Sequence, residues 1–181
     1  MWDSYTPAKR QYPELTQDLR RQIEQIEPSV DSSVEYFPCA VTLVSGQIVD
    51  CVYVAEADSY IETWGVWPDE DPGKRAVQIE HVREIHLSPK RLPRKFAQKM
   101  YAAGESGMGY CLFTLRFVDG SEQSYCTGNL VDFVALPEGK NIADIVGLDP
   151  HQGRSDSAMR GLDYSWCLFG VPPQTDSCAT S

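Results

Sequence analysis

The sequence predicts an α+β protein: an antiparallel, barrel-like β-sheet built from two hairpin units, with an N-terminal helix and one inserted helix. Three observations predict this class. An apolar stripe with helical spacing lies near the N-terminus, two β-rich stretches each reverse at a glycine-containing turn, and a second helical pattern separates these stretches.

The N-terminal helix is indicated by four apolar residues that recur on one helical face: Leu15, Leu19, Ile23 and Ile26. Pro13 suits the first position of a helix, and Pro28 cannot continue one because it lacks the backbone N–H and its ring clashes with the preceding turn. A helix over 13–27 is therefore expected. Residues 1–12 are polar and are expected to be irregular.

The first hairpin unit lies in 39–54, which is rich in β-branched residues and contains the turn dipeptide Ser45-Gly46. Apolar side chains on both faces indicate strands that are buried on both sides. A two-residue turn places Cys39 opposite Val52 and directs Cys51 to the other face, so these two thiols are not expected to form a disulfide. A one-residue bulge would change this geometry.

The second hairpin unit runs from Cys111 to Cys126 and reverses at Asp119-Gly120, a strong turn signal. Both units contain the pattern C-x-x-T-L followed by a glycine and a cysteine: Cys39, Thr42, Leu43, Gly46 and Cys51, then Cys111, Thr114, Leu115, Gly120 and Cys126. Because the gaps after the leucine differ, chance similarity between two hairpins is favoured over an ancient duplication.

The remaining elements are shorter. The inserted helix is expected over 94–103, with Gly104 as its C-terminal stop. The preceding stretch, 77–87, fits either one helix or two short strands, and we favour strands. Two further short strands are expected at 131–136 and 142–148.

Length and composition fit one folded domain: the chain has 181 residues, of which 42% are hydrophobic and 23% charged. We assign this domain to 13–150 and expect 151–181 to be an irregular extension that ends in a disordered tail. The first residues show neither the basic nor the apolar region of a signal peptide, which favours a cytoplasmic location.

The charge balance argues against two classes of partner. The chain has 16 basic and 26 acidic residues, a net charge of −10. Such a chain repels phosphate backbones and anionic lipid, which disfavours nucleic acid as a partner. No apolar run approaches the roughly 20 residues of a membrane span, so no membrane partner is expected. Another protein, of basic character, is the partner that the composition favours.

Six cysteines invite a disulfide interpretation: Cys39, Cys51, Cys111, Cys126, Cys167 and Cys178. The absent secretion signal argues for reduced thiols, and four of them lie in apolar β-like runs, where a free cysteine behaves as a small core residue. Cys178, in the polar tail, is expected to be exposed. No C-x-x-C pair is present, and the spacing of His81 and His86 suits neither a helix face nor a strand face. No metal or other cofactor is therefore predicted.

The most unusual stretch is the glycine-rich loop 104–109, whose backbone could approach a ligand closely. It fails the hydrolase pattern G-x-S-x-G because Met108 stands two residues after Ser106. It also lacks the preceding strand and the Lys-Ser/Thr pair of a phosphate-binding loop. Glu105 and Ser106 are candidate binding residues, although a flexible connection explains the loop more simply.

One alternative function is a small cysteine-dependent hydrolase or ligand-binding enzyme that uses this loop with Cys111 or Cys126. A catalytic thiolate needs an imidazole, which a third polar group orients. Two such sets can be formed: Cys126 with His151 and Asp132 or Asn129, and Cys111 with His86. Nothing in the spacing selects either set, so no catalytic residue is assigned and a non-catalytic function is favoured.

The leading function is a non-catalytic protein that acts through protein–protein contact, such as an immunity-type inhibitor of a basic partner. The acidic stretch 50–71 contains no basic residue, and the candidate binding residues lie at its end: Trp64, Trp67, Asp69, Glu70 and Asp71. Tryptophans supply rigid apolar area, and carboxylates speed the encounter with a cationic partner. The alternative interpretation is that the two tryptophans pin a loop to the core while the charges form a solvated face.

A second alternative function is RNA binding through the basic run 83–99. The predicted helix, followed by the pattern V-x-L-x-x-G that starts at Val41 and by a long second strand, resembles the opening of Sm-like RNA-binding barrels. The resemblance implies a small barrel and an Sm-like or SH3-like RNA-binding module. Cys51 stands where that family has a glycine in its second strand, and the region of Asp58 lacks the family's Met-Asn pair.

Overall fold

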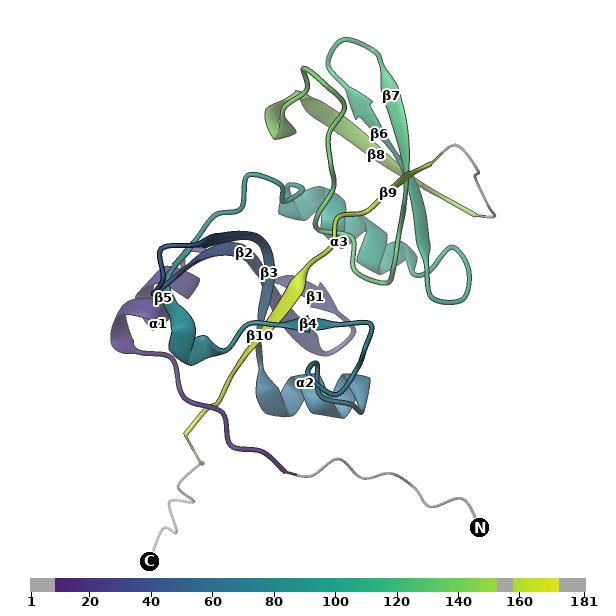
Figure 1. Ribbon diagram of the computed structural model, residues 1–181. Helices are drawn as coiled ribbons and strands as arrows, with labels where there is room; N and C mark the ends of the chain where they lie inside the picture. Colours follow the sequence, from purple (N-terminus) through teal and green to yellow (C-terminus); the bar gives the residue numbers. More distant parts are fainter. Residues whose placement is uncertain (1–8, 153–157, 173–181) are drawn as a thin grey trace, which may run out of the picture.

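The structure, a computed structural model, describes residues 9–152 and 158–172 and has two lobes, each formed around its own β-sheet (Figure 1). The first lobe contains α1 (Gln17–Ile23), β1 (Ser29–Asp31), β2 (Val34–Leu43), β3 (Ile48–Glu56), α2 (Ala57–Trp64), β4 (Arg75–Ala76), the 3-10 helix η1 (Ile79–His81), β5 (Val82–His86) and β10 (Ser165–Phe169). The second lobe contains α3 (Arg94–Ala103), β6 (Cys111–Phe117), β7 (Glu122–Thr127), the 3-10 helix η2 (Ile142–Asp144), β8 (Ile145–His151) and β9 (Met159–Arg160). The second lobe is thus inserted into the first, between β5 and β10.

Both sheets are mixed and open. The first has the strand order β1-β2-β3-β10-β4, with β5 also paired to β2, and the second has the order β8-β6-β7-β9. Strand β10 runs parallel to β3 and β4, and β9 runs parallel to β7. The α+β class is confirmed, but the prediction of an antiparallel, barrel-like sheet was wrong because neither sheet closes and each contains a parallel pairing. Parallel partners lie far apart in sequence, where no turn signal connects them.

Residues after position 150 complete both sheets. The prediction that 151–181 is an irregular extension was wrong for β9 and β10, and Cys167 in β10 is fully buried. The expected disordered tail, with Cys178, lies outside the described residues from 173 onward, and residues 1–8 of the expected irregular N-terminal segment also lie outside them.

Helix α1 is shorter than the predicted 13–27. It begins after Thr16, whose hydroxyl caps the helix by accepting a 3.2 Å hydrogen bond from Leu19 N. Pro13 instead lies in an extended segment, where its carbonyl accepts a hydrogen bond from Gly170 N. The predicted apolar stripe is confirmed, since its four residues are all buried in one core: Leu15, Leu19, Ile23 and Ile26.

The two hairpins, β2–β3 and β6–β7, are confirmed, and so is the inserted helix α3. Each hairpin turns through three loop residues, not two. Leu43 N donates to Gln47 O in the first hairpin, and Phe117 N donates to Ser121 O in the second. The third loop residue is a glycine with positive φ in both, which is the common three-residue hairpin geometry.

The first hairpin keeps the predicted cysteine geometry in spite of its longer loop. A bulge between Cys39 and Val41 compensates for the extra loop residue, so Cys39 still lies opposite Val52. Cys39 and Cys51 pack into different cores, as predicted from their opposite faces, and both thiols are free.

The two lobes repeat one supersecondary unit. In each lobe a hairpin is followed by a 3-10 helix and then by a strand that pairs with the first hairpin strand: β5 with β2, and β8 with β6. A register shift occurs at the same place in both pairings, so that Leu43 faces Val82 and Phe117 faces Ile145. In the structural repeat Leu43 is therefore equivalent to Phe117. The sequence pattern had matched Leu43 with Leu115, so that alignment was shifted by two residues.

Some local predictions were wrong. Helix α2 was missed inside the acidic stretch, and 77–87 forms η1 and a single strand instead of two strands. The expected strand at 131–136 contributes only isolated bridges, and the expected strand at 142–148 begins as η2. Within the described ranges, no helix has both the length and the apolar character needed to cross a bilayer.

Candidate functional site

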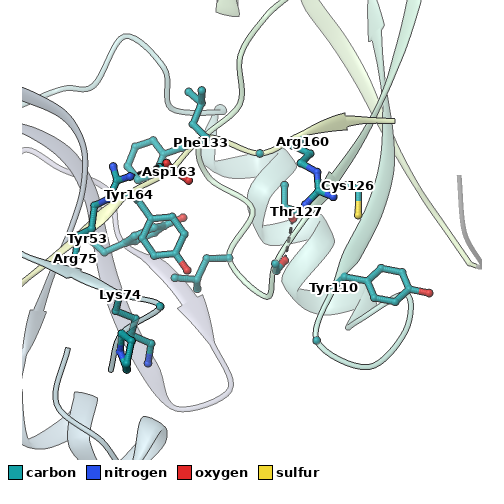
Figure 2. A pocket seen from close by; sticks show the side chains of 17 residues that line it. Tyr53, Lys74, Arg75, Tyr110, Cys126, Thr127, Phe133, Arg160, Asp163 and Tyr164 are labelled. Atoms are coloured by element: carbon teal, nitrogen blue, oxygen red, sulfur yellow. Dashed lines mark hydrogen bonds and ion pairs between the residues drawn. The ribbon is translucent and has the colours of Figure 1, made fainter. Parts of the chain in front are cut away.

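A cleft of about 600 Å³ lies between the two lobes (Figure 2). The first lobe contributes Tyr53 from β3 and the loop 72–75 that leads into β4. The second lobe contributes the end of β7, and the connection 160–164 between β9 and β10 completes the lining. The cleft therefore forms where the chain crosses back from one lobe to the other, and its volume falls in the range of small-molecule sites.

The charged lining of the cleft is mainly cationic. Lys74, Arg75 and Arg160 line it together with one carboxylate, Asp163, in a chain whose net charge is −10. Arg75 Nη2 lies 2.9 Å from Asp163 Oδ2, and both side chains are well exposed. Arg160 forms no ion pair with any residue that the structure describes. Figure 2 shows Arg160 on the side of the second lobe, and Arg75 with Asp163 on the opposite side.

Lys74 is held by aromatic rings of the first lobe. Its ammonium lies 4.3 Å from the centroid of the Trp64 ring and donates a 3.1 Å hydrogen bond to the hydroxyl of Tyr60. Asp71 Oδ2 lies 3.5 Å from the same ammonium. These contacts fix the cleft-lining loop against α2, so Lys74 contributes charge at a defined place.

Beneath the cleft, a fully buried carboxylate connects the two lobes. Asp132 accepts hydrogen bonds from Ser29 of β1 at 2.5 Å, Tyr53 of β3 at 3.1 Å and Tyr101 of α3 at 2.5 Å. Burial raises the pKa of the Asp132 carboxyl, while the hydroxyl donors and nearby Arg91 oppose this shift. The Tyr53 and Phe133 rings, 4.9 Å apart, also line the cleft, so this polar cluster supports its floor.

The catalytic sets considered from the sequence are not assembled. Cys126 lines the cleft, but it is separated from His151 by a whole strand. Leu112 of β6 pairs with Cys126 of β7 on one side and with His151 of β8 on the other, so the backbones of Cys126 and His151 lie roughly 9–10 Å apart at the usual strand spacing. Asp132 binds the three hydroxyls described above. In the other set, Cys111 lies in the second-lobe core, whereas His86 Nε2 lies 3.1 Å from Thr42 Oγ1 in the first lobe.

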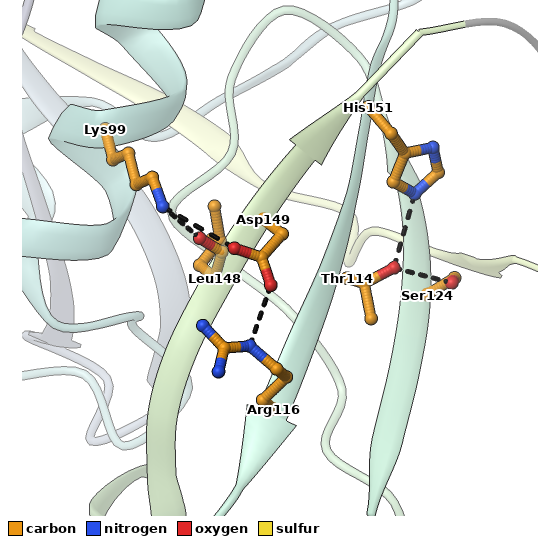
Figure 3. Close-up of polar contacts among 7 residues, drawn as sticks. All are labelled: Lys99, Thr114, Arg116, Ser124, Leu148, Asp149 and His151. Atoms are coloured by element: carbon orange, nitrogen blue, oxygen red, sulfur yellow. Dashed lines mark hydrogen bonds and ion pairs between the residues drawn. The ribbon is translucent and has the colours of Figure 1, made fainter.

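The second sheet carries a row of polar contacts (Figure 3). Thr114 Oγ1 lies 2.9 Å from Ser124 Oγ and 3.3 Å from His151 Nε2. Further along the same strands, Asp149 accepts a 2.7 Å hydrogen bond from Arg116. Lys99 Nζ donates to the carbonyl of Leu148 at 2.6 Å and lies 3.7 Å from Asp149. These contacts tie α3 and β6 to the edge strand β8.

In the glycine-rich loop 104–109, the two candidate binding residues form hydrogen bonds with the backbone of the loop and of the strand that follows it. Ser106 Oγ accepts a 2.7 Å hydrogen bond from Leu112 N, and Glu105 accepts one of 2.9 Å from Gly109 N. The loop borders the cleft through Gly109 and Tyr110 instead, and Figure 2 shows the Tyr110 ring directed away from the opposite wall.

The predicted acidic recognition residues already bind cations of this chain. Trp67 is only 2% exposed, so its side chain presents almost no area at the surface. Asp69 and Glu70 pair with Arg10, and Asp71 lies beside Lys74. The structure thus brings carboxylates, tryptophans and cations together, but within one molecule.

The basic run 83–99 is also used within the molecule. Four of its cations bind elsewhere in the chain: Lys90 with Asp50, Lys99 with Asp149, Arg91 with the carbonyl of Glu27 and Arg94 with that of Pro28. The run therefore holds the first lobe, α3 and β8 together.

The cationic cleft residues were missed by sequence reasoning. Lys74 and Arg75 follow the acidic stretch directly, which was the one available signal, and Arg160 lies in a segment expected to be irregular.

No family model, curated protein or solved structure matches the chain. In the described part of the chain, no group of three or more His, Cys, Asp or Glu side chains is placed to hold a metal ion. Fold and site together define a two-lobed α+β protein with a ligand-sized, basic cleft.

Proposed function

We propose that this protein is a non-catalytic binding protein that takes a small anionic ligand in the cleft between its lobes. One observation carries the proposal: in a strongly acidic chain, two segments far apart in sequence bring three cations to one ligand-sized cavity, Lys74 and Arg75 from one loop and Arg160 from the other lobe. The proposal keeps the non-catalytic class expected from the sequence and assigns the principal site to a basic surface instead of the acidic one.

The chemistry of the lining suits a phosphate or carboxylate. A guanidinium offers paired N–H donors that match such groups, and charge-assisted hydrogen bonds are stronger than neutral ones. Arg160 has no competing carboxylate in the described chain. The Arg75–Asp163 pair is solvent-exposed and therefore contributes little to stability, so an incoming anion can replace Asp163 at low free-energy cost.

Isothermal titration calorimetry with inorganic pyrophosphate at low ionic strength tests this function. We expect binding to the wild type and a loss of roughly tenfold or more in affinity for Arg160→Ala and for Arg75→Ala. Arg83→Ala is the matched control, because Arg83 is exposed on β5 and does not line the cleft. Equal affinity in all four proteins, or no binding to the wild type, contradicts the proposal.

A further inference from the structure

Residues 9–13, here called the N-terminal strap, cross the first lobe as an extended segment without helix or strand structure (Figure 1). At its end, the carbonyl of Pro13 accepts a hydrogen bond from Gly170 N. A Cβ atom on Gly170 would lie only 2.2 Å from the carbonyl oxygen of Tyr12, so the glycine permits this close approach. The strap is otherwise held mainly through side chains.

The side chains of the strap contact the acidic and aromatic residues that the sequence marked for recognition. Arg10 donates hydrogen bonds of 2.7 and 2.9 Å to the two carboxylate oxygens of Asp69 and also pairs with Glu70. Its guanidinium lies 5.3 Å from the centroid of the Trp67 ring. The Tyr12 ring lies 5.3 Å from the same ring. One cation and one aromatic ring, two residues apart, thus contact a tryptophan rimmed by carboxylates.

The strap does not fill the groove in which it lies. A cavity of about 270 Å³ borders it on the side of η1 and β10, and a second of about 340 Å³ borders it on the side of the first turn of α2. Trp166, whose buried indole N–H has no hydrogen-bond partner in the described part of the chain, lines the first cavity with Leu168. The groove is therefore larger than its occupant.

We propose that this groove is a docking site for an extended, arginine-bearing peptide segment of a partner protein, and that the strap occupies it in cis as a competitor. The partner segment carries an arginine for Asp69 and Glu70 and, two residues later, an aromatic ring for Trp67. The strap itself demonstrates this complementarity of charge and shape, because Arg10 and Tyr12 make these contacts.

The strap is suited to displacement. Its ion pairs are partly exposed, with 31% of the Arg10 side chain and 56% of the Asp69 side chain accessible, so water screens them. A trans peptide that makes the same contacts replaces them one for one. Because the groove is open in only a fraction of molecules, the apparent affinity for the peptide is reduced by that fraction. Weakening the strap should therefore strengthen binding in trans.

Fluorescence anisotropy with a labelled peptide of the strap sequence, Lys-Arg-Gln-Tyr-Pro, tests this inference on the full chain. We expect Arg10→Ala to bind the peptide about fivefold to tenfold more tightly than the wild type, because the competing contacts are lost. Adding Asp69→Asn and Glu70→Gln to that variant should abolish the gain. Arg21→Ala is the matched control, since Arg21 is an exposed arginine on α1, outside the strap, and should leave the affinity unchanged.

The outcomes separate the possible occupants. Unchanged affinity in Arg10→Ala, or undiminished affinity after neutralising Asp69 and Glu70, overturns the docking site. A thermal melt of each variant checks that its fold is intact. A strap peptide with alanine in place of its arginine must bind more weakly than the original peptide. Sedimentation of the wild type should show a monomer. A concentration-dependent dimer that is lost in Arg10→Ala would assign the groove to the strap of a second copy and overturn the partner.

Discussion

The phenol of Tyr53 donates a 3.1 Å hydrogen bond to the carboxylate of Asp132, and both residues are completely buried. Tyr53 belongs to β3 of the first lobe, whereas Asp132 follows β7 in the second. The same Tyr53 ring lines the cleft, so the contact that joins the lobes also fixes the floor of the proposed ligand site. Perturbing Asp132 should therefore affect stability and ligand binding together.

Replacing Asp132 with asparagine should destabilise the protein by about 1–3 kcal/mol, because the amide nitrogen takes the place of one carboxylate oxygen and cannot accept the hydroxyl hydrogen bonds made there, whether that of Ser29 or those of Tyr53 and Tyr101. Urea unfolding measures this change. Asp58→Asn, at an exposed position on α2, is the control and should shift the midpoint little. An unchanged midpoint in Asp132→Asn would show that the carboxylate does not stabilise the contact between the lobes.

The raised pKa of Asp132 predicts an unusual pH dependence of its contribution. Burial raises the pKa in the folded state, so this group binds its proton more tightly there than in the unfolded chain. Its contribution to the free energy of unfolding is then greatest below the unfolded pKa of about 4 and falls as the pH rises through the folded pKa. Urea unfolding between about pH 4 and pH 7 should show the wild type losing stability relative to Asp132→Asn as the pH rises. A wild type that gains relative stability over this range would contradict the assigned direction.

Ser106→Ala separates a structural role of the glycine-rich loop from a binding role. The Ser106 hydroxyl accepts a hydrogen bond from Leu112 N and donates one of 3.3 Å to Leu112 O, which clips the loop to β6. We expect its removal to cost about 1–2 kcal/mol in urea unfolding. Pyrophosphate affinity, measured by calorimetry, should stay within twofold of the wild type (roughly 0.4 kcal/mol). A large loss of affinity with unchanged stability would make Ser106 a ligand contact.

Gly128→Val should block the cleft without disturbing the fold. Gly128 lines the cleft at the end of β7, and no atom lies within 4 Å of the position that its Cβ would take. The added side chain therefore projects into open space, and pyrophosphate binding should fall by roughly tenfold or more, whereas the melting temperature should change little. Ala102→Val, at an exposed site on α3 outside the cleft, is the matched control. Full binding by Gly128→Val would place the anion elsewhere.

Sequence patterns predicted the parts of the fold that depend on neighbouring residues. The apolar stripe of α1, the two hairpins and α3 follow from periodicity and turn chemistry within short windows. The structural repeat was obscured for a physical reason. Side chains of a strand alternate between faces, so a comparison shifted by two residues preserves the inward and outward pattern, and the C-x-x-T-L pattern therefore aligned Leu43 with Leu115 instead of Phe117.

The cleft and the parallel strands could not be predicted in the same way. Arg75 and Arg160 approach one cavity only because β10 returns to the first lobe, and no local signal records that return. The role of the acidic stretch as a recognition surface stays a prediction. Its carboxylates and tryptophans lie beside cations of the same chain, Arg10 and Lys74, and these contacts depend on the folded path of the chain, which no local pattern records.

Because β10 lies between β3 and β4 in the first sheet, the first lobe can complete its folding only after the second lobe has been synthesised. Strand β3 leaves the exit tunnel early, yet its second neighbour is encoded more than 100 residues later, after the whole inserted lobe. During translation the β3 edge therefore displays unpaired backbone groups, while the inserted lobe can already fold from contiguous sequence. A premature stop before residue 165 would leave that edge permanently open and the first lobe prone to aggregation.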